Sequence, residues 1–162
     1  MNNRKNTTQI LVISAMFAAL ACVATMIIKV PSPLNGYVNL GDSIVLLAGW
    51  MLPPAYGFMA AGIGSAMADV FSGYALYAPA TFVIKGIMAV IANRLTKKSK
   101  LAGGIIAELA MVGGYLLFES FLYGFVPSLA NIPANCVQGI VCLVIALVAI
   151  RFVKRNPDSF RL

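Results

Sequence analysis

The Lys and Arg residues of this chain are gathered into three short clusters, and the segments between the clusters are almost uniformly apolar. Ten of the twelve cations belong to these clusters, which are Arg4 and Lys5, then Arg94, Lys97, Lys98 and Lys100, then Arg151, Lys154, Arg155 and Arg161. Cytoplasmic Lys and Arg at the ends of hydrophobic segments set the orientation of membrane proteins. The net charge of +7 therefore indicates membrane topology and not nucleic-acid binding.

The composition excludes several classes of protein. The chain has 162 residues, of which 60% are hydrophobic and 10% charged, and a water-soluble domain of this size cannot hide so much apolar surface. Histidine is absent, which removes the commonest general base and metal ligand. No G-x-x-x-x-G-K-S/T sequence occurs, so the chain does not hydrolyse ATP in the P-loop manner. We expect a membrane protein that is not an enzyme and has no cofactor or metal, with free thiols at Cys22, Cys136 and Cys142.

Five apolar blocks are visible, and Pro53-Pro54 interrupts the second of them. The two prolines remove backbone donors, so this block forms either one kinked helix or two shorter helices. Only an even number of crossings places all three basic clusters on one side of the membrane. We therefore predict an all-α bundle of six transmembrane helices with both termini cytoplasmic. The chain forms one domain, residues 1–162, with helices at roughly 9–30, 42–52, 55–71, 79–94, 101–123 and 133–153.

The predicted second helix is short. Eleven residues rise about 16 Å, whereas the hydrocarbon core of a bilayer is about 30 Å thick. Short or broken segments at membrane depth are tolerated where they line a cavity, and they often mark binding sites in transporters. The outer connection that precedes this helix, Pro31–Gly41, is long enough to cover such a cavity.

Ionisable residues inside the predicted spans are rare, and most lie toward the outer side. The outer group consists of Lys29, Asp42, Asp69, Lys85 and Glu119. A charge at membrane depth is unfavourable, so it usually faces protein or water and has a purpose. Asp69 and Lys85 are expected to be neighbours, either as a structural ion pair or as ligand contacts.

Two stripes of polar residues lie along predicted helices. Glu108, Tyr115 and Glu119 follow one line on helix 101–123, which indicates a stripe that faces the bundle interior. It is either a proton relay or a source of a ligand acceptor at Glu119. Asn131, Asn135 and Gln138 share one face at the outer end of the last helix, and Cys142 continues it. These amides either join helices or recognise a neutral polar ligand.

Aromatic residues gather on the same outer side, where they form either an interfacial belt or a pocket for a flat heterocycle. They are Tyr37, Phe71, Tyr74, Tyr77, Phe121, Tyr123 and Phe125. Trp50, near the cytoplasmic side, is expected to be an ordinary belt residue.

Small residues mark two helices. Ala15 and Ala19 form a small-xxx-small pair, the spacing that lets membrane helices approach closely, and they suggest a flat face for another protein. Helix 55–71 has small residues around much of its circumference, which predicts a position in the middle of the bundle.

Three sequence blocks resemble a known family. They are Asn39-Leu40-Gly41-Asp42-Ser43, then Gly64-Ser65-Ala66-Met67-Ala68-Asp69 leading to Ser72-Gly73-Tyr74, then residues 77–86, YAPATFVIKG. Together they resemble the substrate-binding (S) components of energy-coupling factor (ECF) vitamin transporters, and most closely the riboflavin-type branch. The resemblance implies six helices in a bacterial cell (plasma) membrane and a high-affinity vitamin site near the outer surface.

The resemblance also implies partners. Family members associate with a transmembrane coupling protein of the EcfT type and two ATPase subunits, and an Ala-xxx-Ala motif on their first helix contacts the coupling protein. Ala15 and Ala19 match that motif. Related members take riboflavin, pyridoxine or the pyrimidine precursor of thiamine, and the sequence does not choose among them.

We expect a vitamin-binding membrane subunit with a pocket at the outer ends of its helices. The candidate ligand-binding residues are Asn39, Asp42, Asp69, Tyr74, Tyr77, Lys85, Glu119, Tyr123, Asn131, Asn135 and Gln138. One alternative is a self-sufficient proton-coupled transporter that uses Glu108 and Glu119. Another is an intramembrane lipid-modifying enzyme, which the lack of histidine disfavours.

Overall fold

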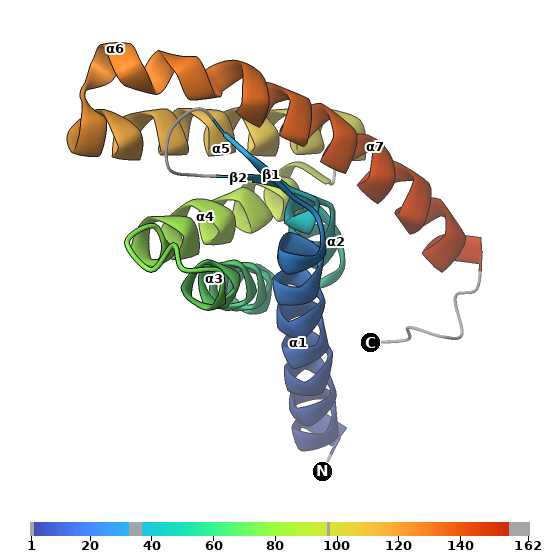
Figure 1. Ribbon diagram of the computed structural model, residues 1–162. Helices are drawn as coiled ribbons and strands as arrows, with labels where there is room; N and C mark the ends of the chain where they lie inside the picture. Colours follow the sequence, from blue (N-terminus) through green and yellow to red (C-terminus); the bar gives the residue numbers. More distant parts are fainter. Residues whose placement is uncertain (1, 33–36, 97, 156–162) are drawn as a thin grey trace.

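The computed structural model describes residues 2–32, 37–96 and 98–155, and this part of the chain is mainly helical (Figure 1). Its longer helices are α1 (Asn2–Ile27), α2 (Gly41–Met51), α3 (Pro54–Phe71), α4 (Ala78–Thr96), α5 (Lys100–Tyr123) and α7 (Ile132–Arg155). A hairpin of β1 (Lys29–Pro31) and β2 (Tyr37–Asn39) joins α1 to α2, and the short helices α6 (Phe125–Ser128) and η1 (Leu129–Asn131) join α5 to α7. The predicted helical bundle with a short second helix is confirmed.

Four helical segments of the described chain are long and apolar enough to cross a membrane. They are Thr7–Ile27, Ala78–Thr96, Lys100–Tyr123 and Phe125–Val153. α3 has 18 residues and α2 has 11. The short length of α2 is possible because it is enclosed by protein: Val45, Leu46 and Ala48 are almost completely buried, and α2 packs against α1, α3, α4 and α7.

The break between α2 and α3 follows from the two prolines. Leu52 takes an extended conformation, as a residue before proline prefers, and Pro54 occupies the first turn of α3, where its missing N–H is harmless. The carbonyl groups left free at the end of α2 are satisfied by Asn93 of α4, whose Nδ2 donates to the oxygens of Gly49 and Leu52 at 2.9 Å each.

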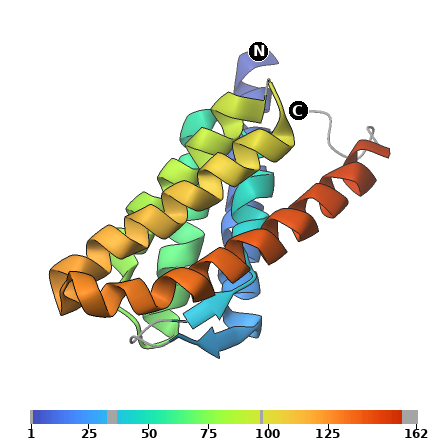
Figure 2. The ribbon, with the colours of Figure 1, turned by 90° about the horizontal axis from the view of Figure 1, so that it is seen from above.

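The ends of the helices separate into two groups, as Figure 2 shows. The start of α1, the connection between α4 and α5 and the end of α7 lie at one end of the bundle, which we call the basic end. The hairpin, the α3–α4 turn and the α5–α7 connection lie at the opposite end, which we call the hairpin end. The three basic clusters therefore share one end, as an even number of crossings requires. Lys97 and Arg161 of these clusters lie outside the described residues.

The structure corrects two expectations about where helices end and begin. α1 ends at Ile27 and not near residue 30, because Lys29–Pro31 pairs antiparallel with Tyr37–Asn39. Pro31 favours this result, since it biases Val30 toward extended backbone. The connection that the predicted helices left between residues 123 and 133 is helical over Phe125–Ser128 and Leu129–Asn131. Asn131 therefore precedes the last helix and does not belong to it.

Two predictions about packing are also corrected. Trp50 is not a lipid-facing belt residue: it is buried in the core, with Lys100 Nζ 5.7 Å from its ring centroid. Its helix is the enclosed α2, which leaves no side free for lipid. α3 buries its small residues, and Gly64 lies so close to α1 that a Cβ would stand 2.3 Å from the Ala18 oxygen. However, Met59 and Met67 of α3 are exposed, so α2 and not α3 occupies the middle.

Candidate functional site

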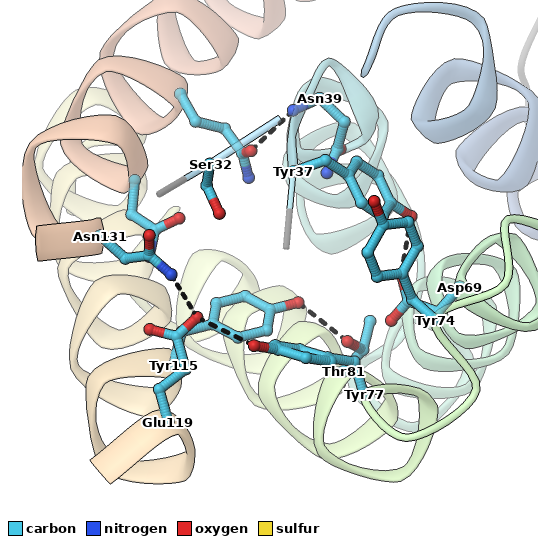
Figure 3. A pocket seen from close by; sticks show the side chains of 12 residues that line it. Ser32, Tyr37, Asn39, Asp69, Tyr74, Tyr77, Thr81, Tyr115, Glu119 and Asn131 are labelled. Carbon is cyan, nitrogen blue, oxygen red and sulfur yellow. Dashed lines mark hydrogen bonds between the residues drawn. The ribbon is translucent and has the colours of Figure 1, made fainter. Parts of the chain in front are cut away.

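A small polar cavity lies at the hairpin end of the bundle (Figure 3). The hairpin, the end of α3 and its turn, α4, α5, η1 and α7 all contribute to its wall. The lining residues are Ser32, Tyr37, Asn39, Asp69, Tyr74, Tyr77, Thr81, Tyr115, Glu119, Asn131, Asn135 and Gln138. The free space is about 30 Å³, which is room for about one water molecule. Any larger ligand therefore requires these side chains to move apart.

One side of the cavity joins the hairpin to α3. The Tyr37 hydroxyl donates to Asp69 Oδ1 at 2.7 Å, and the Tyr37 ring lies 4.8 Å from that of Tyr74. Burial raises the pKa of Tyr37 above its ordinary value, and the charge of Asp69 raises this pKa further. Tyr37 therefore keeps its proton and remains a donor. On the outer side, Lys29 Nζ donates to Ser72 Oγ at 2.8 Å.

The opposite side of the cavity is built around Glu119. Its Oε1 accepts hydrogen bonds from Asn131 Nδ2 at 2.7 Å and from the Tyr77 hydroxyl at 3.5 Å. Tyr77 also bonds the hydroxyl of Tyr123 at 3.5 Å and meets the ring of Phe118 edge to face. These contacts fix one oxygen of the Glu119 carboxyl and leave the other without a partner in the described part of the chain.

A chain of polar contacts lies beneath the cavity. The backbone N–H of Asn39 donates to Gln138 Oε1 at 2.8 Å, and Gln138 Nε2 donates to Asp42 Oδ2 at 2.6 Å. The other oxygen of Asp42 forms an ion pair with Lys85, and both side chains are almost fully buried, 1% and 3% exposed. Lys85 Nζ also lies 5.2 Å from the ring centroid of Tyr115, whose hydroxyl contacts Thr81 Oγ1 at 3.0 Å. This series of polar contacts connects the hairpin, α2, α4 and α7.

One of the two readings of Asp69 and Lys85, a direct ion pair between them, is wrong, and the other, that both contact a ligand, stays a prediction. Lys85 forms its ion pair with Asp42, and Asp69 instead accepts a hydrogen bond from Tyr37. The prediction assumed that the polar ends of successive helices meet. In the structure α2 lies in the centre of the bundle and packs against α4, which brings the first turn of α2 to the buried lysine.

The structure gathers most of the candidate ligand-binding residues around the cavity. Eight of them line it: Asn39, Asp69, Tyr74, Tyr77, Glu119, Asn131, Asn135 and Gln138. Asp42 and Lys85 lie beneath it as an ion pair, and Tyr123 stands behind Tyr77. Asn131 and Gln138 bond to side chains of other elements, as the reading of the amide stripe as a helix contact predicts. All three amides line the cavity, and recognition of a ligand by them stays a prediction.

Four lining residues were missing from the candidate set, and three of them carried a signal. Thr81 precedes Lys85 by one helical turn, and Tyr115 precedes Glu119 by one turn on the same stripe. Tyr37 is two residues before Asn39, so both side chains fall on the same face of a strand. Ser32 lies just beyond a three-residue strand and carried no pattern of this kind.

The inner carboxyl of the α5 stripe lies away from the cavity. Glu108 is buried, as is Glu119, so the interior orientation of the stripe is confirmed. A Cβ on Gly139 of α7 would stand 3.1 Å from Glu108 Oε2, which shows how closely α7 covers this carboxyl. The two carboxyls are about 16 Å apart along the helix axis. Glu108 borders a separate apolar groove between α5 and α7 of about 180 Å³.

The face that carries Ala15 and Ala19 is open. Both alanines are exposed on α1 and border an apolar groove of about 690 Å³ between α1 and α3. Ile63 and Met67 of α3 form part of the other wall. This surface is separate from the polar cavity, since no residue lines both.

Comparison with known proteins identifies the family. The family model described as ECF-type riboflavin transporter, S component, matches residues 5–155. This chain belongs to that S-component family. It is therefore a vitamin-type substrate-binding subunit of a transporter and a multi-pass protein of the plasma membrane, as the sequence blocks predicted. Members of this family are transporter components and not enzymes.

Two relatives and one solved structure are similar to the chain over most of its length. An uncharacterised protein from a gap 3′ region of Pyrococcus woesei is 35% identical over 129 residues, which are 76% of this chain and 86% of the relative. The thiamine precursor transporter HmpT of Lactococcus lactis is 26% identical over 148 residues, 90% of this chain and 88% of HmpT. A solved structure of the S component of a bacterial ECF transporter superposes with a TM-score of 0.76 at 25% identity. The match covers 92% of this S component and 97% of the solved chain.

Proposed function

We propose that this S component binds a small heterocyclic vitamin or vitamin precursor with high affinity in the polar cavity and delivers it for ATP-driven uptake. The observation that carries the proposal is the wall of the cavity, in which four tyrosines stand among buried carboxyls and amides (Figure 3). Tyrosine rings offer flat surfaces for stacking, and a few polar atoms fix the orientation of a ring. The family description points to riboflavin, and the name of HmpT points to a thiamine precursor.

We further propose that the ATP-hydrolysing partners are supplied by an ECF module of one EcfT-type coupling protein and two ATPases. The groove beside Ala15 and Ala19 is the proposed docking surface for the coupling protein, because it is apolar, exposed and bordered by small side chains. Residues 1–162 form the single S-component domain of this assembly.

Purification and transport measurements test this function. The protein is expressed alone, and small molecules released on denaturation are identified by mass spectrometry. We expect a heterocyclic vitamin or precursor at about one equivalent. The same compound should enter vesicles that contain the S component, the coupling protein and the ATPases, and it should do so only with ATP on the cytoplasmic side.

ATPases inactivated at the P-loop lysine are the control for the transport measurement. Uptake that continues with inactive ATPases and stops when the proton gradient is dissipated would contradict the proposal. That result would favour the proton-coupled alternative through Glu108 and Glu119.

Truncation of cavity side chains should weaken binding without unfolding the protein. We expect Asn135→Ala and Glu119→Ala each to reduce the binding free energy by about 1–3 kcal/mol, because each removes a buried polar contact to the ligand. Isothermal titration calorimetry with the co-purified compound measures the change. Ser120→Ala is the matched control, since the Ser120 hydroxyl bonds Leu116 of its own helix and does not line the cavity. Unchanged ligand affinity in both cavity variants would show that the ligand binds at another place in the protein.

A further inference from the structure

The cavity has an unbalanced set of polar groups. Asp69 and Glu119 both line it, and they are only 6% and 3% exposed. Each carboxyl has one oxygen engaged by a tyrosine or an amide, while Asp69 Oδ2 and Glu119 Oε2 have no hydrogen-bond partner in the described part of the chain. Buried carboxyl oxygens without partners are rare in folded proteins, because burial removes their hydrogen bonds with water. Both oxygens of Glu108 are also without partners among the described residues, but Glu108 does not line the cavity. The oxygens of Asp69 and Glu119 belong to cavity-lining residues, where a ligand can supply the missing donors.

No positive charge balances these carboxyls within the described wall of the cavity. Two lysines approach lining residues, and both are engaged elsewhere. Lys85 packs on Tyr115 from beneath and forms an ion pair with Asp42. Lys29 lies over the Tyr37 ring on the exposed side and donates to Ser72. Residues 33–36, which the structure does not describe, are Pro-Leu-Asn-Gly and carry no charge.

The two acidic groups stand on opposite sides of the cavity, as Figure 3 shows. Asp69 comes from the end of α3, and Glu119 from α5 beside η1. A single donor group on a ligand cannot contact Asp69 and Glu119 at the same time, because the two carboxyls are on opposite sides of the cavity (Figure 3). A ligand that satisfies both must therefore lie between them and present a donor at each of two opposite edges.

From these observations, and resting on the proposed function, we infer that the cavity selects an unphosphorylated heterocycle that is neutral or positively charged. Its donor groups, such as an amino group, a hydroxyl or a protonated ring nitrogen, face Asp69 at one edge and Glu119 at the other. A phosphate ester would bring up to two negative charges against a wall that holds two acidic groups and no Lys or Arg among its described lining residues. Like charges brought together in a buried site repel strongly, so the esters are rejected.

Paired ligands test the inference. The probes are 4-amino-5-hydroxymethyl-2-methylpyrimidine, pyridoxine and riboflavin, each compared by calorimetry with its own monophosphate ester on the purified protein. We expect the free compound that binds best to bind at least 100-fold more tightly than its ester. Glu119→Gln and Asp69→Asn keep the shape of the side chains and remove their charges. Each variant should bind the free compound at least tenfold more weakly. The ratio between the affinities for the free compound and for its ester should also fall.

Glu108→Gln is the matched control, because it removes a buried carboxyl from the same helix at a place outside the cavity. It should leave both affinities within twofold. An ester that binds as tightly as its parent compound, or an advantage that both cavity variants leave unchanged, would overturn the inference but not the proposed function. If no free compound binds and none enters vesicles with the ECF module, the proposed function itself is wrong.

Discussion

Replacement of Ala15 and Ala19 together by leucine is expected to reduce vitamin uptake to background while ligand affinity stays within twofold. Both alanines are exposed on α1, so leucine side chains at these positions do not enter the core. They do fill the groove between α1 and α3 and prevent the close approach of another helix that small residues allow. The ligand cavity shares no lining residue with this groove, which is why binding should persist.

Two measurements separate docking from folding in this experiment. Calorimetry on the isolated protein reports ligand affinity, and co-purification with the tagged coupling protein reports assembly. Ala102→Leu provides the control, because Ala102 is an exposed alanine on α5 and is not part of the groove. Equal loss of uptake and of ligand binding would contradict a role of Ala15 and Ala19 in docking. Normal uptake by the double leucine variant would contradict it as well.

Replacement of Lys85 by methionine should have the largest effect on stability. The change leaves Asp42 buried without its ion-pair partner, and such an unpaired charge destabilises a protein by about 3–5 kcal/mol. Reversible unfolding in mixed micelles measures the change in free energy. The double variant Asp42→Asn with Lys85→Met should recover much of the loss, since asparagine is neutral and its side-chain oxygen still accepts from Gln138.

The comparison between single and double variants makes the ion pair testable. If Lys85→Met has the same free energy of unfolding as the unmodified protein, the buried ion pair does not contribute to stability. If the double variant is as unstable as the single one, the loss comes from the packing of Lys85 against Tyr115 and not from the unpaired carboxylate.

The sequence predicted those parts of the fold that depend on local chemistry. The basic clusters indicated which helix ends lie together, and Pro53 and Pro54 indicated the break after α2. The hairpin was not predicted, because strands of three residues carry almost no pattern. The position of α2 in the centre of the bundle was not predicted either. That placement depends on how six apolar surfaces pack together, and apolar surfaces look alike in sequence.

The same distinction applies to the cavity. Polar and aromatic residues at the outer ends of helices were recognisable, because such side chains are costly at membrane depth unless they face protein or water. Thr81 and Tyr115 were left out of the candidate set although each lies one turn from a candidate residue on its own helix. Their place in the cavity wall depends on the convergence of α4 and α5, which the sequence does not show. The partner of Lys85 was misassigned for the related reason that contact between α2 and α4 is a long-range property.

The position of Gly41 links the hairpin to α1. Its amide donates to the Asn39 side chain at 2.8 Å, and a Cβ at this glycine would stand 2.0 Å from Thr25 Oγ1 of α1. Asn39, Gly41 and Thr25 are therefore closely packed against one another. The helix that bears Ala15 and Ala19 therefore touches the turn that follows Asn39 at the edge of the cavity, which places the groove and the cavity on one continuous path of packed residues.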